Sequence, residues 1–150
     1  MRNALLSVLL LAGIVLNATM GLLIFTHPHY GPMVEAHWKM SNTDKLWYAI
    51  CEVESGNTVD AVNTSEQAVG VAQIRPIMVK DVNRILGEER YAHPTDALSP
   101  IKSREMFDIY TAHYFPEGEA EQMARGWNGG PKGPSKRATK AYWAKVQENM

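Results

Sequence analysis

The sequence predicts a mainly helical chain with one small domain that follows an apolar N-terminal segment. Three observations lead to this class. Apolar residues recur at helical spacing in several segments bounded by Gly or Pro, and one stretch rich in turn-forming residues interrupts them with short alternating apolar positions. A long uncharged run stands at the start of the chain. With 150 residues and 45% apolar side chains, the chain can bury the core of a single domain.

The first 26 residues predict a membrane anchor. Residues 4–25 hold no charged side chain, and 22 helical residues cover about 30 Å, the thickness of a bilayer core. A secretory signal is the alternative, because Arg2 and the leucine-rich centre suit it equally. Leu16 stands where the cleavage site needs a small residue, which favours the anchor. Arg2 would stay in the cytoplasm, so we expect the domain on the extracytoplasmic (periplasmic) side of the membrane.

Residues 27–43 read as a tether that precedes a domain spanning residues 44–150. His27, His29 and His37 lie in it, but neither Cys nor a carboxylate stands nearby at ligand spacing, so we predict no metal site. No cofactor is expected either. Cys51 is the only cysteine, which excludes an internal disulfide and favours a small buried filler over a redox thiol.

The helix predicted over residues 44–55 carries one carboxylate on its apolar side. Leu46, Ile50 and Val53 share a face with Glu54, whereas Glu52 is turned outward. Ser41 followed by Asp44 predicts the helix start and Gly56 its end. An apolar setting and the negative end of a helix both favour the protonated acid, which is what general-acid chemistry needs. Pairing with a buried cation, or capping of a loop, is the structural alternative for Glu54.

The rest of the chain predicts an irregular loop and four further helices. Residues 57–76 combine turn formers with Gly70 and predict a loop with a small strand. Pro76 and Gly87 bound the next helix, and Ser99 with Pro100 begins another that ends before Pro116. Two shorter helices are predicted over residues 119–127 and 135–147.

The charge balance excludes a general polyanion binder. The chain holds 15 basic and 16 acidic residues, so we expect no nucleic-acid partner. Residues 122–147 contain six basic residues and no acid. This end could face anionic wall polymer or lipid headgroups, although a solvated helix face explains it as well.

Four short blocks, in order, resemble the soluble lytic transglycosylase family of the lysozyme-like superfamily. They are Glu54-Ser55, the segment GVAQIRP at residues 70–76, the segment WNGGP at residues 127–131, and a closing Tyr142. The residues of these blocks are most similar to those of the small transglycosylases associated with phage particles and with secretion or conjugation machines. The resemblance implies an α+β lysozyme-like fold whose catalytic helix ends at Glu54.

The resemblance implies a lyase that cleaves the MurNAc-GlcNAc β-1,4 bond of peptidoglycan and opens the cell wall locally. Glu54 would first protonate the glycosidic oxygen and then, as a base, assist attack by the muramyl C6 hydroxyl, giving a 1,6-anhydro product. Asp60 and Glu66 are the only acids in the following loop, and neither takes a motif position. A hydrolytic muramidase is therefore the alternative enzyme, and a catalytically inactive wall-binding assembly protein is the alternative outside catalysis.

The resemblance also implies the residues that bind substrate. Gln73 and Asn128 would hydrogen-bond sugar groups, and Tyr142 would place its hydroxyl near Glu54. Trp127 replaces the tyrosine of the family's third block and would stack on a sugar face. Ser55 would brace the helix end. Gln73 could instead tie the loop to the helix, and Tyr142 could be a core aromatic residue.

The predicted partners follow from these readings. They are glycan strands of peptidoglycan, a membrane through the N-terminal helix, and virion or secretion-apparatus proteins. A membrane-anchored or virion-associated location is expected.

Overall fold

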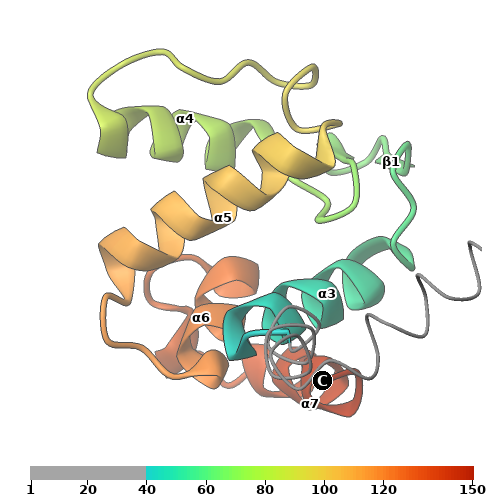
Figure 1. The fold of residues 1–150 in the computed structure, drawn as a ribbon, viewed down its shortest axis with the longest axis vertical. Coiled ribbons are helices and arrows are strands. Elements are labelled where there is room, and N and C mark those ends of the chain that lie inside the picture. The colour runs from blue at the N-terminus through green and yellow to red at the C-terminus, as the bar shows by residue number, and fades with distance from the viewer. Residues whose placement is uncertain (1–39) are drawn as a thin grey trace, which may run out of the picture. The chain divides into compact units, whose positions relative to one another are not determined.

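The computed structural model of the chain describes residues 40–150, and this part is mainly helical, as predicted (Figure 1). Its elements are α3 (Asn42–Ser55), β1 (Val62–Asn63), β2 (Ala68–Val69), α4 (Pro76–Leu86), α5 (Pro100–Tyr114), α6 (Ala120–Gly129), the 3-10 turn η1 (Gly133–Ser135) and α7 (Thr139–Glu148). Within residues 40–150 no helix has the length and apolar character needed to cross a membrane. The anchor predicted over residues 1–26, and most of the tether, lie outside the described residues.

Helix α3 begins and ends where its capping residues require. The Ser41 side chain accepts a hydrogen bond from the Asp44 backbone N–H, and the Asp44 carboxylate accepts one from the Ser41 N–H, which makes a capping box. Gly56 ends the helix in the left-handed conformation, with φ +61°. The helix therefore starts two residues before the predicted start, and Glu54 lies in its last turn.

A two-stranded antiparallel hairpin follows α3. Val62 pairs with Val69 and Asn63 with Ala68. Gly70 comes next with φ +76°, and a side chain at this position would collide with the backbone carbonyl of Ala97. The irregular region predicted after the first helix is therefore a short hairpin held against the segment that precedes α5.

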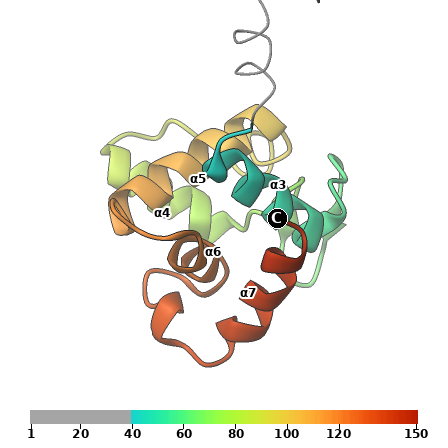
Figure 2. The same cartoon turned by 60° about the horizontal axis from the view of Figure 1, so that its bottom comes forward.

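Helices α4 and α5 pack against each other on one side of the domain (Figures 1 and 2). Pro76 stands in the first turn of α4, and Gly87 ends this helix with φ +72°. The Ser99 hydroxyl accepts a hydrogen bond from the Lys102 N–H at the start of α5. Both helices have the boundaries that their Pro, Ser and Gly residues predict.

The last helix differs from its prediction, because α7 begins at Thr139 and not at residue 135. A 3-10 turn precedes it, and the Thr139 hydroxyl donates to the Gly133 carbonyl at 2.7 Å. The same hydroxyl accepts from Arg125 Nε at 3.0 Å. Arg125 is buried and also donates to the Lys136 carbonyl and to Glu121. This network fixes α6 against α7.

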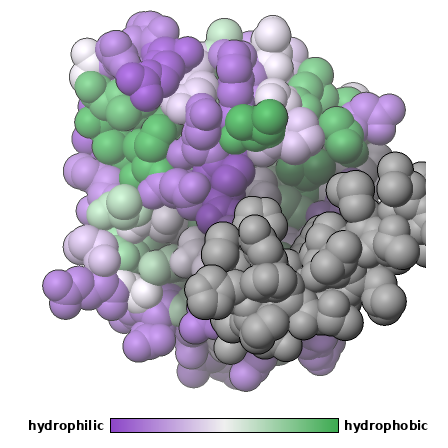
Figure 3. Space-filling model, in the orientation of Figure 1, coloured by the Kyte–Doolittle hydropathy of each residue, from purple (hydrophilic) through white to green (hydrophobic). Residues whose placement is uncertain are grey.

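An aromatic cluster lies where α3, α5 and α6 meet. Phe107 contacts both Trp47 and Trp127, with ring centroids 5.2 Å and 5.3 Å away, and Tyr110 contacts Trp127 at 5.8 Å. Ile50 and Met106 are fully buried beside these rings. On the face shown in Figure 3, polar side chains predominate and apolar groups gather over α4 and α5. The core thus packs α3, α5 and α6 together, and the ends of α3 and α6 contribute two walls of the site.

Candidate functional site

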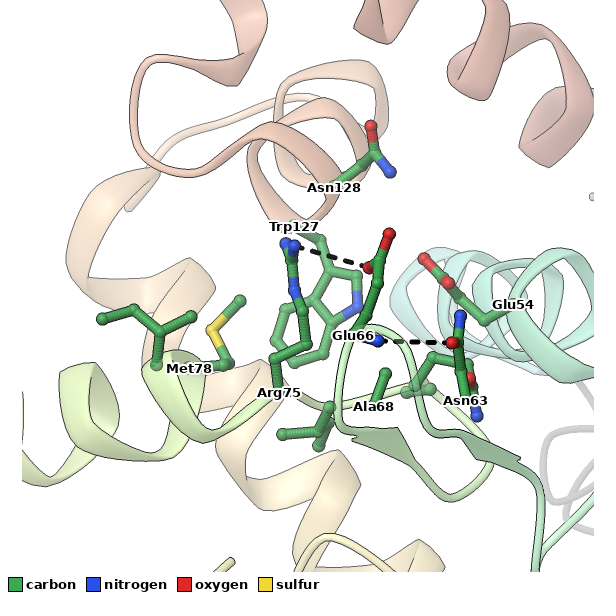
Figure 4. Close-up of a pocket in the computed structure, with 12 residues that line it drawn as sticks. Glu54, Asn63, Glu66, Ala68, Arg75, Met78, Trp127 and Asn128 are labelled. Carbon is green, nitrogen blue, oxygen red and sulfur yellow. Dashed lines mark hydrogen bonds and ion pairs between the residues drawn. The ribbon is translucent and has the colours of Figure 1, made fainter.

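A cleft of about 280 Å³ opens beside the C-terminal end of α3 (Figure 4). Residues from four places form its walls: the end of α3, the hairpin, the start of α4 and the end of α6. The lining residues are Glu54, Asn63, Glu66, Ala68, Ala72, Gln73, Ile74, Arg75, Ile77, Met78, Trp127 and Asn128. The structure therefore gathers into one cleft four of the six site residues that the sequence suggested.

Glu54 is half-buried in the wall of this cleft. Burial raises the pKa of its carboxyl above the ordinary value, and the negative charge of Glu66 acts in the same direction. The hydrogen bond from Tyr142 and the charge of Arg75 oppose this rise without cancelling it. Glu52, two residues earlier, is exposed, as the helix phase predicts.

Tyr142 and Ser55 lie next to the cleft and do not line it. The Tyr142 hydroxyl, from α7, donates a hydrogen bond to Glu54 Oε1 at 2.8 Å. The Ser55 hydroxyl donates to the Val71 carbonyl at 2.8 Å and accepts from the Thr58 N–H at 3.1 Å. Tyr142 thus orients the carboxyl, and Ser55 braces the end of α3 against the loop.

The remaining predicted site residues differ in the solvent exposure of their side chains. Asn128 is exposed, while Trp127 is only 4% exposed and belongs mainly to the aromatic core. Gln73 has φ +46°, and its amide nitrogen donates to the Gly70 carbonyl at 3.0 Å. This bond lies within the loop and does not reach α3, so it differs from the tie between loop and helix that the alternative for Gln73 proposed. Figure 4 shows Asn128 above Trp127, on the side of the cleft opposite the hairpin.

Three polar residues of the cleft were not assigned a role from the sequence. Arg75 forms an ion pair with Glu66 at 3.5 Å, and the Glu66 N–H donates to Asn63 Oδ1 at 3.3 Å (Figure 4). Glu66 and Asn63 lie in the hairpin and its turn, so only the pairing of β1 with β2 brings them to Glu54. A charged residue directly before the helix-starting Pro76 was the one available indication for Arg75.

Cys51 lies one turn before Glu54 on α3 and is buried. Burial, with the nearby Glu54 charge, raises the pKa of its thiol to about 12. The thiol thus keeps its proton at neutral pH and fills space, as the sequence favoured. Within residues 40–150 no group of three or more His, Cys, Asp or Glu side chains is arranged to hold a metal ion.

The arrangement gives a cleft that can bind a polar, largely uncharged ligand. The raised pKa of Glu54 favours its protonated form, in which the carboxyl can donate a hydrogen bond to a neutral ligand oxygen. The amides of Asn63 and Asn128 can both donate and accept. Ile77 and Met78 add apolar surface beside these groups. The charges of Arg75 and Glu66 offset each other.

The comparisons with known proteins find a structural likeness. No family model matches the chain, and no curated protein matches it. The chain is similar to a chain of a solved structure, the crystal structure of Aeromonas hydrophila PliI in complex with Meretrix lusoria lysozyme. The identity is 25% and the TM-score is 0.60, over 73% of this chain and 89% of the matched chain.

These findings contradict the predicted membership of the soluble lytic transglycosylase family. The matched structure is that of a PliI complex with lysozyme, and no transglycosylase model matches. The predictions that depended on this membership are withdrawn: cleavage of the glycosidic bond by a transglycosylase or muramidase, the anhydro product and the enzyme class. The association with phage or secretion machines receives no support from the comparison.

The structure gives a physical reason why short motifs misled the prediction. Several of the matching residues are required by local geometry: Gly70 by its positive φ, Pro76 by its place in the first turn of α4, and Ser55 by its bond to the Val71 carbonyl. Sequence blocks made of caps, turns and helix starts indicate how the backbone folds locally. They do not by themselves indicate an activity.

Proposed function

We propose that the protein is a binding protein that holds a glycan strand of peptidoglycan in the cleft beside Glu54. The observation that carries this proposal is the combination of a half-buried carboxyl with a raised pKa, amide side chains and apolar side chains in one open cleft. A sugar ring offers hydroxyl and amide groups at its edge and apolar C–H groups on its face. Such a ring can use both kinds of surface at once.

The charges of the cleft favour a sugar over a polyanion. Arg75 and Glu66 neutralise each other at the mouth, and Glu54 keeps its proton to higher pH than a free glutamate does. A volume of about 280 Å³ suits a short part of a polymer whose other residues continue beyond the walls. A largely uncharged glycan strand meets these conditions.

The structural likeness supports a partner related to peptidoglycan. The matched structure contains lysozyme, a peptidoglycan-hydrolysing enzyme. The finer identification, the glycan strand itself, is our proposal and depends on the lining of the cleft.

Two binding measurements test the proposal. Titration calorimetry with chitotetraose measures the affinity for an unsubstituted β-1,4 glycan, and co-sedimentation with purified sacculi measures binding to the polymer. We expect Asn128→Ala to weaken binding about three- to tenfold, since a lost hydrogen bond contributes about 1 kcal/mol. Asn149→Ala, at an exposed asparagine after α7, serves as the matched control and should bind like the wild type.

Two outcomes would overturn the proposal. One is the absence of binding to both chitotetraose and sacculi. The other is turnover: if the wild type releases soluble fragments from sacculi and Glu54→Gln does not, the cleft cleaves the strand and is not a binding site alone. Glu52→Gln, at an exposed carboxylate of the same helix, is the control for this comparison.

A second candidate function is the binding of a lysozyme. The observation that favours it is that the matched structure is a complex of PliI with lysozyme. Here the protein would form a stable complex with lysozyme on size-exclusion chromatography and slow the clearing of a cell-wall suspension. A mixture that elutes as two separate proteins and clears at the rate of lysozyme alone would exclude it.

We also propose that residues 1–26 anchor the domain in a membrane, with the cleft on the extracytoplasmic side. The uncharged run of residues 4–25 supports this placement. The intact mass of the protein recovered from membranes tests it, because cleavage of a signal would remove these residues.

A further inference from the structure

A second cavity of about 430 Å³ continues from the glycan cleft along α4. Four residues line both spaces: Arg75, Ile77, Met78 and Trp127. Figure 4 shows Arg75 between Met78 and the Glu66–Glu54 side of the cleft. A ligand in the cleft can therefore extend past Arg75 into this second cavity, which we call the side groove.

The side groove has an apolar floor. Met78, Tyr110, Tyr114 and Trp127 contribute to it, together with Pro131 after α6. Tyr110 and Trp127 are buried core residues, and the rings of Tyr110 and Tyr114 lie 4.8 Å apart. This floor is more apolar than the glycan cleft.

The rim of the side groove carries an excess of positive charge. Asp81 is its only acid, and it accepts hydrogen bonds from Arg84 at 2.9 Å and from the Tyr114 hydroxyl at 2.9 Å. Arg84 and Asp81 therefore neutralise each other. Arg75 and Lys80 remain: Arg75 has one long ion pair at 3.5 Å with the exposed Glu66, and Lys80 forms no ion pair with any residue in 40–150. Lys80 is exposed and can receive a carboxylate directly, whereas Arg75 can receive one only if the ligand displaces Glu66.

We infer that the side groove binds the peptide substituent of the glycan: a short peptide with small aliphatic side chains and at least one free carboxylate. Its aliphatic side chains would lie on the Met78–Tyr114 floor, and its carboxylate would reach Lys80 or displace Glu66 from Arg75. The inference rests on the proposed glycan function and adds the substituent that the site selects. Continuity with the glycan cleft and charge complementarity are the two observations that support it.

Calorimetry with three ligands separates the contributions. The ligands are chitotetraose, a tetrasaccharide with lactyl carboxylates but no peptide, and the same tetrasaccharide with its peptides. We expect the peptide-bearing ligand to bind at least tenfold more tightly than chitotetraose at low salt. The gain should shrink as salt rises, because the rim charges are exposed.

Variants at the rim of the side groove test whether its lysine binds the peptide. Lys80→Glu should remove most of the gain for the peptide-bearing ligand and leave chitotetraose binding unchanged, because Lys80 lies outside the glycan cleft. The matched control is Lys45→Glu, at an exposed lysine on α3 that lines neither space. It should retain the full gain.

The outcomes distinguish failure of the inference from failure of the proposed function. If chitotetraose binds but the peptide adds nothing, or if Lys80→Glu behaves like Lys45→Glu, the side groove is not a peptide site. If the lactyl carboxylates alone give the whole increase in affinity over chitotetraose, the carboxylates bind at Arg75, the side groove binds no peptide and the peptide assignment is wrong. If none of the three ligands binds, the glycan function itself fails.

Discussion

Glu54 is a carboxyl whose burial costs stability when it is ionised. Its pKa is raised in the folded protein, chiefly by burial, so between the unfolded and the folded pKa the folded state binds more protons than the unfolded chain. The stabilising contribution of the protonated form is complete below the unfolded pKa and is lost as pH rises through the folded pKa. Glu54 thus lowers the free energy of unfolding at neutral and alkaline pH.

Glu54→Gln should therefore stabilise the protein at pH 7 and leave its stability almost unchanged at pH 4. Glutamine has the same shape, can still accept the Tyr142 hydrogen bond and carries no charge to bury. Thermal denaturation of both proteins at the two pH values measures the effect. Glu52→Gln, on the exposed face, should show no such pH-dependent gain, and an equal gain in both variants would contradict the role of burial.

Tyr142 opposes the burial of Glu54 by donating to its carboxylate at 2.8 Å. This bond favours the ionised form and lowers the pKa of Glu54, so Tyr142→Phe should raise that pKa further. The carboxyl carbon shift of Glu54, followed by NMR titration, gives the value in each protein. Tyr48→Phe, at an exposed tyrosine of α3, is the control, and an unchanged pKa in Tyr142→Phe would show that the bond is absent in solution.

At the scale of elements, Gly70 holds the hairpin against the segment before α5. Alanine at this position faces two costs: the left-handed φ, about 1 kcal/mol, and contact with the Ala97 backbone, about 2 kcal/mol more. We expect Gly70→Ala to lower the free energy of unfolding by about 3 kcal/mol in a urea titration. Gly87→Ala has a similar φ and open space around it, so it should lose only about 1 kcal/mol.

Arg125 fixes α6 to α7 and thereby sets the distance between the cleft wall and Tyr142. Its guanidinium donates to Thr139, to the Lys136 carbonyl and to Glu121 while buried. Arg125→Met keeps most of the packing but leaves the Thr139 and Lys136 oxygens without this donor. We expect a loss of about 2 kcal/mol in the same titration, and near-zero change for the exposed Arg90→Met. Equal losses in the two variants would show that the network is not what joins the helices.

The elements that capping residues define could be predicted from the sequence. Ser41 with Asp44, Pro76 with Gly87, and Ser99 all act within a few residues, so their effect is visible in the chain itself. The start of α7 could not be predicted, because it depends on bonds from Thr139 to Gly133 and Arg125 across the fold. A sequence therefore predicts a helix boundary only where the residue that caps the helix bonds to a partner a few residues away in the chain.

The same distinction explains which site residues could be predicted. The phase of one helix was enough to single out Glu54 from Glu52. Glu66, Asn63 and Arg75 reach the cleft only because the hairpin folds beside α3, which no periodicity reveals. The family resemblance was contradicted for a related reason: its motif residues have structural roles that several functions can share.

At the scale of the whole molecule, residues 40–150 contain every part of the core and of the cleft described above. The buried apolar residues between Leu46 and Val146 form one cluster, and each wall of the cleft comes from within residues 40–150. The sequence placed the domain boundary at residue 44, whereas the structure places the cap of α3 at Ser41. The first residues needed for stability therefore precede the predicted boundary.

A fragment of residues 40–150 should unfold cooperatively and bind chitotetraose like the full chain. A fragment of residues 44–150 should be less stable by about 1 kcal/mol, because it lacks the Ser41 cap while its Asp44 keeps the ion pair with Arg104 at 2.9 Å. Urea denaturation of both fragments, with Ser41→Ala in the longer one, measures the difference. If Ser41→Ala and the shorter fragment lose the same amount, the cap alone sets the boundary; if neither loses stability, the domain begins at residue 44 as the sequence predicted.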